Sequence, residues 1–197
     1  MAAARPDTAQ HFRSQLAFPG GALMCTSASV HWALACLHRR KDDLFAAGLL
    51  DTVMRWAADR HAEIGRAGGG ARMLQHEEVV AAIGLPDAFA RETYNGHHLD
   101  NASPAELAGF GRVVHMPAVD ALLEPASACV VTANQHTVAA YRDATGALYL
   151  FDSLPGVERR LDGPGALPAA FRHHLGPFDV CDLTHFSLKH RGRRRTG

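Results

Sequence analysis

The apolar pattern of the sequence changes near residue 127, and this change limits the fold more than any other feature. Before that point, apolar residues recur every three or four positions, as at Val30, Ala33, Leu34 and Leu37, which is typical of amphipathic helices. After it, short runs of β-branched and aromatic residues are bounded by turn residues, as expected for strands. The order predicts the α+β class, with an N-terminal helical part packed on a C-terminal antiparallel sheet.

The C-terminal half contains the clearest local pattern. Strands are predicted over 128–133, 136–142 and 147–151, and the sequence Asp-Ala-Thr-Gly at 143–146 is a turn that joins the last two as an antiparallel hairpin. Ser153-Leu154-Pro155-Gly156 ends this hairpin. We also expect a helix near 166–174 and a final strand near 179–188.

The N-terminal half predicts several helices and one long loop. A helix begins near Cys25, after the turn Pro19-Gly20-Gly21. Residues 85–103 are rich in Asn, Gly, His and Pro and are expected to form a loop. The other predicted helices cover 42–65, 73–83, 104–109 and 117–123.

These elements predict one catalytic domain over 15–189, with helices in 24–123 and the sheet in 127–188. We expect residues 1–14 to be a flexible lead-in and the basic residues 190–197 to be a disordered tail.

Charge and composition exclude several classes of protein. Lys+Arg and Asp+Glu number 20 each, so the chain lacks the excess positive charge that a nucleic-acid-binding protein uses against phosphates. No apolar run is long enough for a membrane span, and no signal peptide is expected. The four cysteines are widely spaced, which predicts free thiols. Cys181, His185 and His190 lack a fourth ligand for zinc, so neither metal nor cofactor is expected.

Three residues stand in an order that suits nucleophilic catalysis. Cys25 opens a predicted helix, His136 opens a strand, and Asp152 follows the next strand. Because neighbouring strands of a hairpin run in opposite directions, the start of one lies beside the end of the other, so His136 and Asp152 should be neighbours. A helix N-terminus and an imidazolium both stabilise a thiolate, and a carboxylate orients the imidazole. The sequence therefore predicts a Cys-His-Asp triad.

Two segments resemble the papain-like cysteine proteases. The stretch from Gly20 to Ser27, running into a hydrophobic helix, is similar to their nucleophile segment, above all in herpesvirus large tegument deubiquitinases and their bacterial relatives. The stretches 135–138 and 149–153 are similar to the paired strands that hold the base and its orienter. The viral enzymes have a His two residues after the Asp, where this chain has Leu154, so His136 matches the broader clan.

The resemblance implies a papain-like fold and hydrolysis of the bond after the C-terminal Gly-Gly of ubiquitin or a ubiquitin-like modifier. Gln15 then corresponds to the glutamine of the oxyanion hole. Glu92, Tyr94 and Gln135 are candidates for binding the substrate tail, as are Asp42-Asp43 and Glu77-Glu78 by their chemistry alone. We expect a monomer that acts on ubiquitin or polyubiquitin and binds neither nucleic acid nor membrane.

Two alternatives stay open at this point. The chain is then either a papain-like peptidase or acyltransferase acting on other host proteins, or a catalytically silent binding module. The Ala- and Arg-rich composition is typical of a GC-rich bacterial genome, and with the resemblance it predicts a bacterial effector secreted into the host cell cytoplasm.

Overall fold

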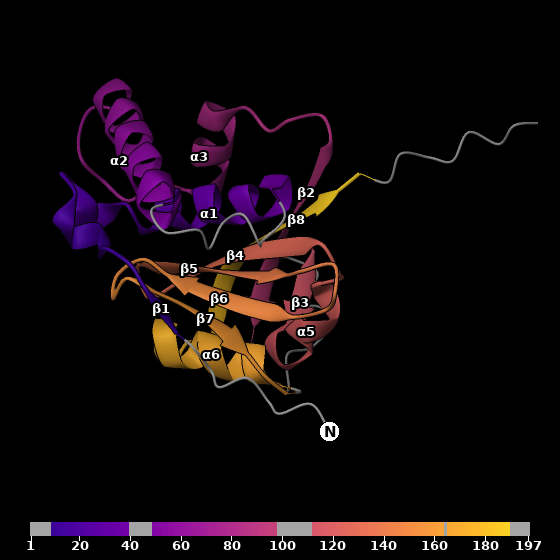
Figure 1. Cartoon of the computed structure of the whole chain (residues 1–197). Coiled ribbons are helices and arrows are strands. Elements are labelled where there is room, and N and C mark those ends of the chain that lie inside the picture. Colours follow the sequence, from indigo (N-terminus) through magenta and orange to yellow (C-terminus); the bar gives the residue numbers. More distant parts are fainter. Residues whose placement is uncertain (1–8, 40–48, 98–111, 164, 190–197) are drawn as a thin grey trace, which may run out of the picture.

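The computed structural model of the chain describes residues 9–39, 49–97, 112–163 and 165–189. These residues form one sheet of eight strands in the order β1-β7-β6-β5-β4-β8-β2-β3. Helices α1, α2 and α3 cover one face of the sheet, and α5 and α6 lie on the other (Figure 1). The helices are α1 (Cys25–Arg39), α2 (Leu49–Ala67), α3 (His76–Ile83), α5 (Val119–Leu122) and α6 (Ala166–Leu175).

The strands pair antiparallel except for β2 with β3. The described residues also contain three short 3-10 helices, η1 (Gln15–Ala17), η2 (Gly21–Leu23) and η4 (Met116–Ala118). The strands are β1 (Gln10–His11), β2 (Phe89–His97), β3 (Val113–His115), β4 (Ser127–Ala133), β5 (His136–Arg142), β6 (Leu148–Asp152), β7 (Val157–Leu161) and β8 (Val180–Leu188).

Helix α1 is buried between the sheet and helices α2 and α3. Trp32 is fully buried, and its ring stacks on Phe151 with 5.0 Å between centroids and meets the edge of Tyr141. The Ser29 hydroxyl donates to the carbonyl of Thr137 in β5 at 3.1 Å. These contacts hold the axis of α1 across β5 and β6, so the start of the helix has a fixed place relative to the sheet.

A second apolar core fills the opposite face. Leu167 and Phe171 of α6 pack against Val138 and Leu150 of the central strands. Since successive residues of a strand point to opposite faces, Val138 and Leu150 identify which side chains of β5 and β6 face α6.

The predicted hairpin of the C-terminal half is confirmed. Strands β5 and β6 pair antiparallel around residues 143–146, where Gly146 has a φ of 89° and the Asp143 carboxylate accepts from the amides of Thr145 and Ala147. Strands β4 and β5 are joined by Asn134 and Gln135, which both have positive φ, as in the tight turns that match the twist of a hairpin.

The prediction of a loop over 85–103 was wrong for its central part. Residues Phe89–His97 form β2, which pairs along its whole length with β8. The predicted helical part 24–123 therefore contributes two strands, β2 and β3, to the sheet. The signal was weak because this segment is polar and contains Gly96, and its strand form depends on a distant partner.

On the side of the sheet beyond β6 are two further strands that the sequence did not reveal. Strand β7 follows the hairpin, and β1 pairs with β7. Within the expected flexible lead-in, residues 10–14 are tied to the sheet: the Phe12 ring stacks on Phe151 at 5.1 Å, and its amide donates to the carbonyl of Gly156 at 3.0 Å. Residues 42–48, the predicted helix 104–109 and the basic tail lie outside the described residues.

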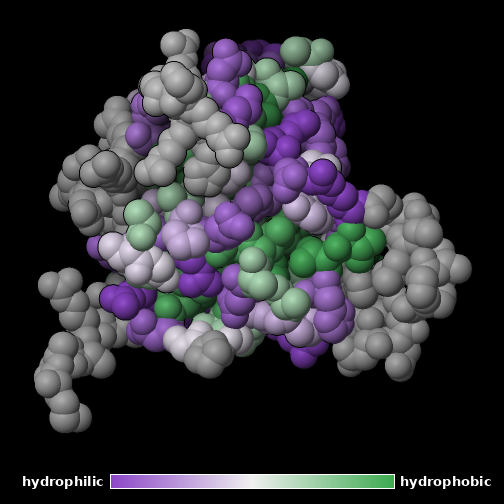
Figure 2. All heavy atoms as spheres, turned by 90° about the vertical axis from the view of Figure 1, so that its right-hand side faces the viewer, coloured by the Kyte–Doolittle hydropathy of each residue, from purple (hydrophilic) through white to green (hydrophobic). Residues whose placement is uncertain are grey.

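Two further observations concern membrane-spanning helices and the surface. No helix within the described ranges has the length and apolar composition needed to cross a membrane. On the side of the molecule where β2 and β3 lie, hydrophobic atoms gather in a band between hydrophilic areas (Figure 2).

Candidate active site

Cys25 is the first residue of α1, and a tight glycine turn places it there. Gly20 adopts a left-handed φ of 71°, and η2 follows it directly. Gly21 packs so closely on Gln15 that a Cβ at this position would overlap the Gln15 carbonyl oxygen. Because the amides of the first helical turn have no partner within the helix, the sulfur lies beside free N–H groups and the positive end of the helix dipole.

His136 and Asp152 are neighbours, as the hairpin spacing predicted. Ala139 is opposite Phe151 in the pairing of β5 with β6, so the side chains of His136 and Asp152 lie diagonally on the same face. His136 Nε2 and Asp152 Oδ1 are 2.9 Å apart, and Oδ1 also accepts from the amide of Leu154 at 3.0 Å. The Nε2 atom is thus occupied, and Nδ1 is left for the thiol.

The Cys25 thiol lies near enough to His136 for the imidazole to lower the thiol's pKa through hydrogen bonding and charge, so a chain of interactions runs from Cys25 through His136 to Asp152. Thr137, the next residue of β5, also contacts the sulfur through its hydroxyl and its backbone. The structure therefore brings together the three residues that the sequence placed in a triad, and it adds a hydroxyl group beside the sulfur. Cys25 is 2 % exposed.

The pKa shifts in this chain favour a thiolate–imidazolium pair. Burial raises the pKa of the Cys25 thiol, but the hydrogen bond and charge of His136 and the contacts with Thr137 outweigh it, so the pKa is lowered overall. Burial alone would lower the pKa of His136, whereas its bonds to Asp152 and Cys25 raise it to about 9. Burial opposes ionisation of Asp152, yet His136 and His174 lower its pKa to about 2.

His174 is a residue of this site that the sequence did not single out. It comes from α6, and its Nδ1 lies 2.7 Å from Asp152 Oδ2, so each oxygen of the carboxylate has its own imidazole. A signal was present in the sequence, because His174 shares the stripe of Leu167, Ala170 and Phe171 that faces the core. A polar residue on an apolar stripe needs an internal partner.

Gln15 is fixed from two directions by Ser153, the residue after Asp152. Its backbone amide donates to the carbonyl of Ser153 at 2.9 Å, and its side-chain Oε1 accepts from the Ser153 hydroxyl at 2.5 Å. The side chain is buried. Since the oxygen of the amide is engaged, the Nε2 group is the one that can donate to another partner.

The three candidate residues for binding a substrate tail lie in different places. Gln135 is exposed, directly precedes His136, and lines a cavity of about 380 Å³ together with Leu74. Glu92 and Tyr94 lie on β2, which is separated from β5 by β8 and β4. Glu92 is paired there with the Tyr94 hydroxyl and with Arg112, so the structure does not bring these two residues to the triad.

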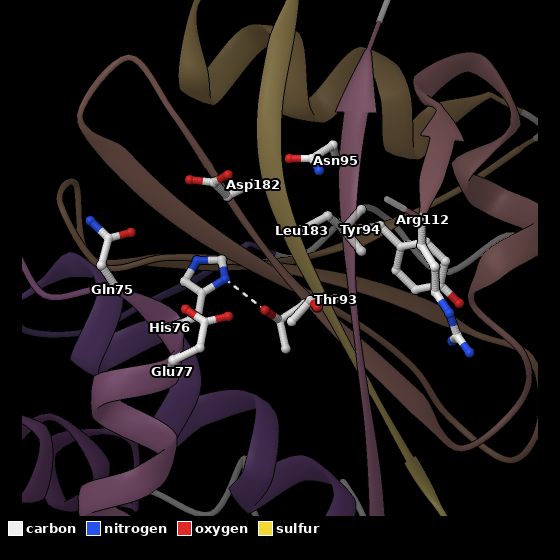
Figure 3. Close-up of a pocket in the computed structure, with 10 residues that line it drawn as sticks. Gln75, His76, Glu77, Thr93, Tyr94, Asn95, Arg112, Asp182 and Leu183 are labelled. Atoms are coloured by element: carbon white, nitrogen blue, oxygen red, sulfur yellow. Dashed lines mark hydrogen bonds between the residues drawn. The ribbon is translucent and has the colours of Figure 1, made fainter. Parts of the chain in front are cut away.

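A second cavity, of about 310 Å³, lies between α3 and strands β2 and β8 (Figure 3). Among the described residues, no group of three His, Cys, Asp or Glu side chains is arranged to hold a metal ion. The cavity walls are mainly polar and include His76, Thr93, Tyr94, Arg112 and Asp182.

Comparisons with known proteins give a likeness in fold. No protein-family model matches the sequence, and a comparison with curated proteins finds no match either. Among solved structures, the chain is similar to the ubiquitin-specific protease encoded by murine cytomegalovirus tegument protein M48, in complex with a ubiquitin-based suicide substrate. The TM-score is 0.64 at 15 % identity, and the match covers 94 % of this chain and 89 % of the viral chain. The fold expected from the sequence is confirmed: the chain has the papain-like α+β fold of this viral protease.

Proposed function

We propose that the chain is a cysteine deubiquitinase that hydrolyses the isopeptide bond after the C-terminal Gly-Gly of ubiquitin. The observation that supports this most is the chain of interactions from Cys25 through His136 to Asp152, with the pKa of the thiol lowered and that of the imidazole raised. The similar viral structure is a ubiquitin-specific protease with a ubiquitin-based substrate, which supports ubiquitin as the partner.

In this proposal the Cys25 thiolate attacks the carbonyl carbon of the terminal glycine, and a carbon–sulfur bond forms. The amide nitrogen of the substrate lysine takes a proton from the His136 imidazolium and leaves as a neutral amine, so a thioester remains. Water then attacks the thioester while His136 accepts one of its protons, and the carbon–sulfur bond breaks. The thiolate–imidazolium pair is restored, and the carboxylic acid product loses its proton to solvent. Asp152 holds the imidazole in the orientation and tautomer that both steps need.

Gln15 is assigned to the oxyanion hole. The Nε2 group of its side chain, together with the free amides at the start of α1, would donate to the oxygen that becomes negative when the carbonyl is attacked. Its anchoring by Ser153 supports this role, because a pre-ordered donor needs no rearrangement during the reaction.

The substrate tail is proposed to approach past Gln135, which is exposed next to His136 and lines the adjacent cavity. Glu92 and Tyr94 would contact ubiquitin only if the bound protein extends as far as β2. We further propose that the protein acts as a monomer, on ubiquitin, polyubiquitin or a ubiquitin-like modifier, as a bacterial effector in the host cell.

A ubiquitin probe with a C-terminal electrophile tests the proposal. We expect the wild-type chain to form a covalent adduct at Cys25, and Cys25→Ala to form none. Cys129→Ala is a matched control, because Cys129 is also buried and burial raises the pKa of its thiol, which leaves it protonated. This variant should react like the wild type.

Three outcomes would contradict the proposal. An adduct at Cys36, Cys129 or Cys181 would show that the nucleophile is misassigned. Alkylation of Cys25 by iodoacetamide at the rate of a free peptide thiol would favour a silent binding module. Reaction with peptide electrophiles but with no ubiquitin or ubiquitin-like probe would favour a peptidase or acyltransferase of other substrates.

A further inference from the structure

A line of hydrogen-bonded side chains runs from the start of α1 to the second cavity. The Oγ1 atoms of Thr26 and Thr137 are 3.0 Å apart, and those of Thr137 and Thr132 are 2.7 Å apart. Thr132 Oγ1 lies 2.7 Å from His76 Nε2, and the other ring nitrogen, Nδ1, lies 2.8 Å from Thr184 Oγ1. The Cys25 sulfur joins the line through the Thr137 hydroxyl.

The members of this line are enclosed. Thr26, Thr137, Thr184 and His76 are all buried, and Thr132 is half-buried. His76 extends from the first turn of α3 toward β8 (Figure 3), where Thr184 is its hydrogen-bond partner. Because these buried groups take their hydrogen-bond partners from one another, the position of each hydrogen depends on the neighbouring groups.

The number of hydrogens that these groups can donate allows two directions of donation along the line. Each hydroxyl has one hydrogen to donate and two lone pairs, and a neutral imidazole has one N–H and one acceptor nitrogen. If His76 accepts at Nε2, Thr132 must donate to it, Thr137 must donate to Thr132, and Thr137 has no hydrogen left for the sulfur.

The opposite arrangement frees that hydrogen. If His76 donates from Nε2, Thr132 accepts from it and donates to Thr137. Thr26 donates into the second lone pair of Thr137, and the Thr137 hydrogen then points to the sulfur. A hydrogen bond from Thr137 to a thiolate at Cys25 therefore requires the tautomer in which His76 donates from Nε2.

His76 is in the neutral form that this scheme requires. Burial lowers its pKa, against the opposing charges of Glu77 and Asp182. One ring nitrogen consequently donates and the other accepts.

We propose that His76 is a positioning residue for the nucleophile: it donates from Nε2 to Thr132, and through Thr137 this directs a hydrogen bond to the Cys25 sulfur. The inference rests on the proposed function in one respect, the use of Cys25 as a thiolate. His76 touches neither the sulfur nor the imidazole of His136 in this scheme and acts only through the two threonines.

Amide variants of His76 give the sharpest test. Gln places an amide nitrogen near the position of Nε2, whereas Asn places its amide nitrogen near Nδ1. The readout is the rate of alkylation of Cys25 by iodoacetamide as a function of pH, measured on the peptide that contains Cys25 by mass spectrometry. Because this reaction needs no ubiquitin and only the thiolate reacts, the midpoint of the pH profile reports the pKa of the thiol.

We expect the pH profile of His76→Gln to have nearly the same midpoint as that of the wild type. In His76→Asn and Thr132→Val the midpoint should lie about 1 pH unit higher, which corresponds to a tenfold smaller ionisation constant of the thiol. Thr93→Val is the matched control, because Thr93 lines the same cavity but is not in the line of hydroxyls, and it should leave the rate unchanged. Thermal unfolding of each variant separates these effects from loss of the fold.

The outcomes separate the two proposals. If the profile of wild-type Cys25 has the midpoint of a free thiol, the proposed function fails. If the wild-type midpoint is lowered and those of His76→Gln, His76→Asn and Thr132→Val all match it, the positioning role of His76 is wrong and the proposed function stands. An equal upward shift in the Gln and Asn variants would also overturn the inference, because it would show a packing effect without directionality.

Discussion

Replacing Asp152 by Asn removes the charge that stabilises the His136 imidazolium. The rise of the His136 pKa from 6.5 to about 9 corresponds to about 3 kcal/mol in favour of the charged ring. Asp152 supplies a large part of this energy, through the 2.9 Å hydrogen bond and through its charge, and the rest comes from Cys25. Asn keeps an oxygen at the same place but has no charge, so we expect the His136 pKa to fall to about 7.

This change predicts a specific pH profile. At pH 8.5, a pKa of about 9 leaves about three quarters of His136 protonated, whereas a pKa of about 7 leaves about 3 %. At pH 6 both proteins are almost fully protonated. The kcat/KM for a fluorogenic ubiquitin C-terminal amide should therefore have an alkaline limb near pH 9 in the wild type and near pH 7 in Asp152→Asn, so the variant's relative loss is about 25-fold greater at pH 8.5 than at pH 6.

Asp162→Asn is the control for loss of a carboxylate, since Asp162 is exposed and paired with Arg160 at 3.2 Å. It should keep the wild-type profile. An alkaline limb that stays near pH 9 in Asp152→Asn would refute the assignment of the imidazolium to this carboxylate. A loss of equal size at pH 6 and pH 8.5 would show that Asp152 acts only on the fold.

Three further predictions concern the same site. His174→Asn keeps a donor near Nδ1 and should be stable, whereas His174→Leu leaves Asp152 Oδ2 buried and unpaired and should lower the free energy of unfolding in urea by roughly 1.5–3 kcal/mol. Gly21→Ala should lower both the melting temperature and kcat, because its Cβ would displace the backbone of Gln15. The Asp152 pKa falls from 3.8 to about 2 on folding, so its contribution of about 2 kcal/mol is complete above pH 3.8 and is lost as the pH falls through about 2. Urea unfolding at pH 5 and pH 2 should show a smaller decrease for Asp152→Asn than for the wild type.

The parts of the fold that depend on residues close together in the sequence were predictable. The hairpin of β5 and β6 follows from two apolar runs and a turn within 17 residues, Leu148 being opposite Arg142. Its register alone made His136 and Asp152 neighbours. Strand β2 was not predictable, because nothing near Phe89–His97 in the sequence shows that this polar segment will pair with β8.

The candidate site follows the same rule. The roles of Cys25 and His136 could be predicted from the sequence, because a Cys at the start of a helix and a His at the start of a strand each have few roles. His174 and His76 were missed, since their partners come from elements that are distant in the sequence: Asp152 for the one, Thr132 and Thr184 for the other. Their positions are settled by how α6 and α3 pack on the two faces of the sheet, which no local pattern encodes.

The attachment of residues 10–15 to the sheet has a practical consequence for protein engineering. Trimming the chain to just before Gln10 would leave the pairing with β7 and the Phe12 stack intact. Removing the chain through Ser14 would remove both, and Gln15 would then become the free end of the polypeptide, held to the sheet by Ser153. A shortened variant of that kind could keep its circular dichroism spectrum and still process substrate poorly, so crystallisation and tagging designs should retain the stretch from Gln10 onward.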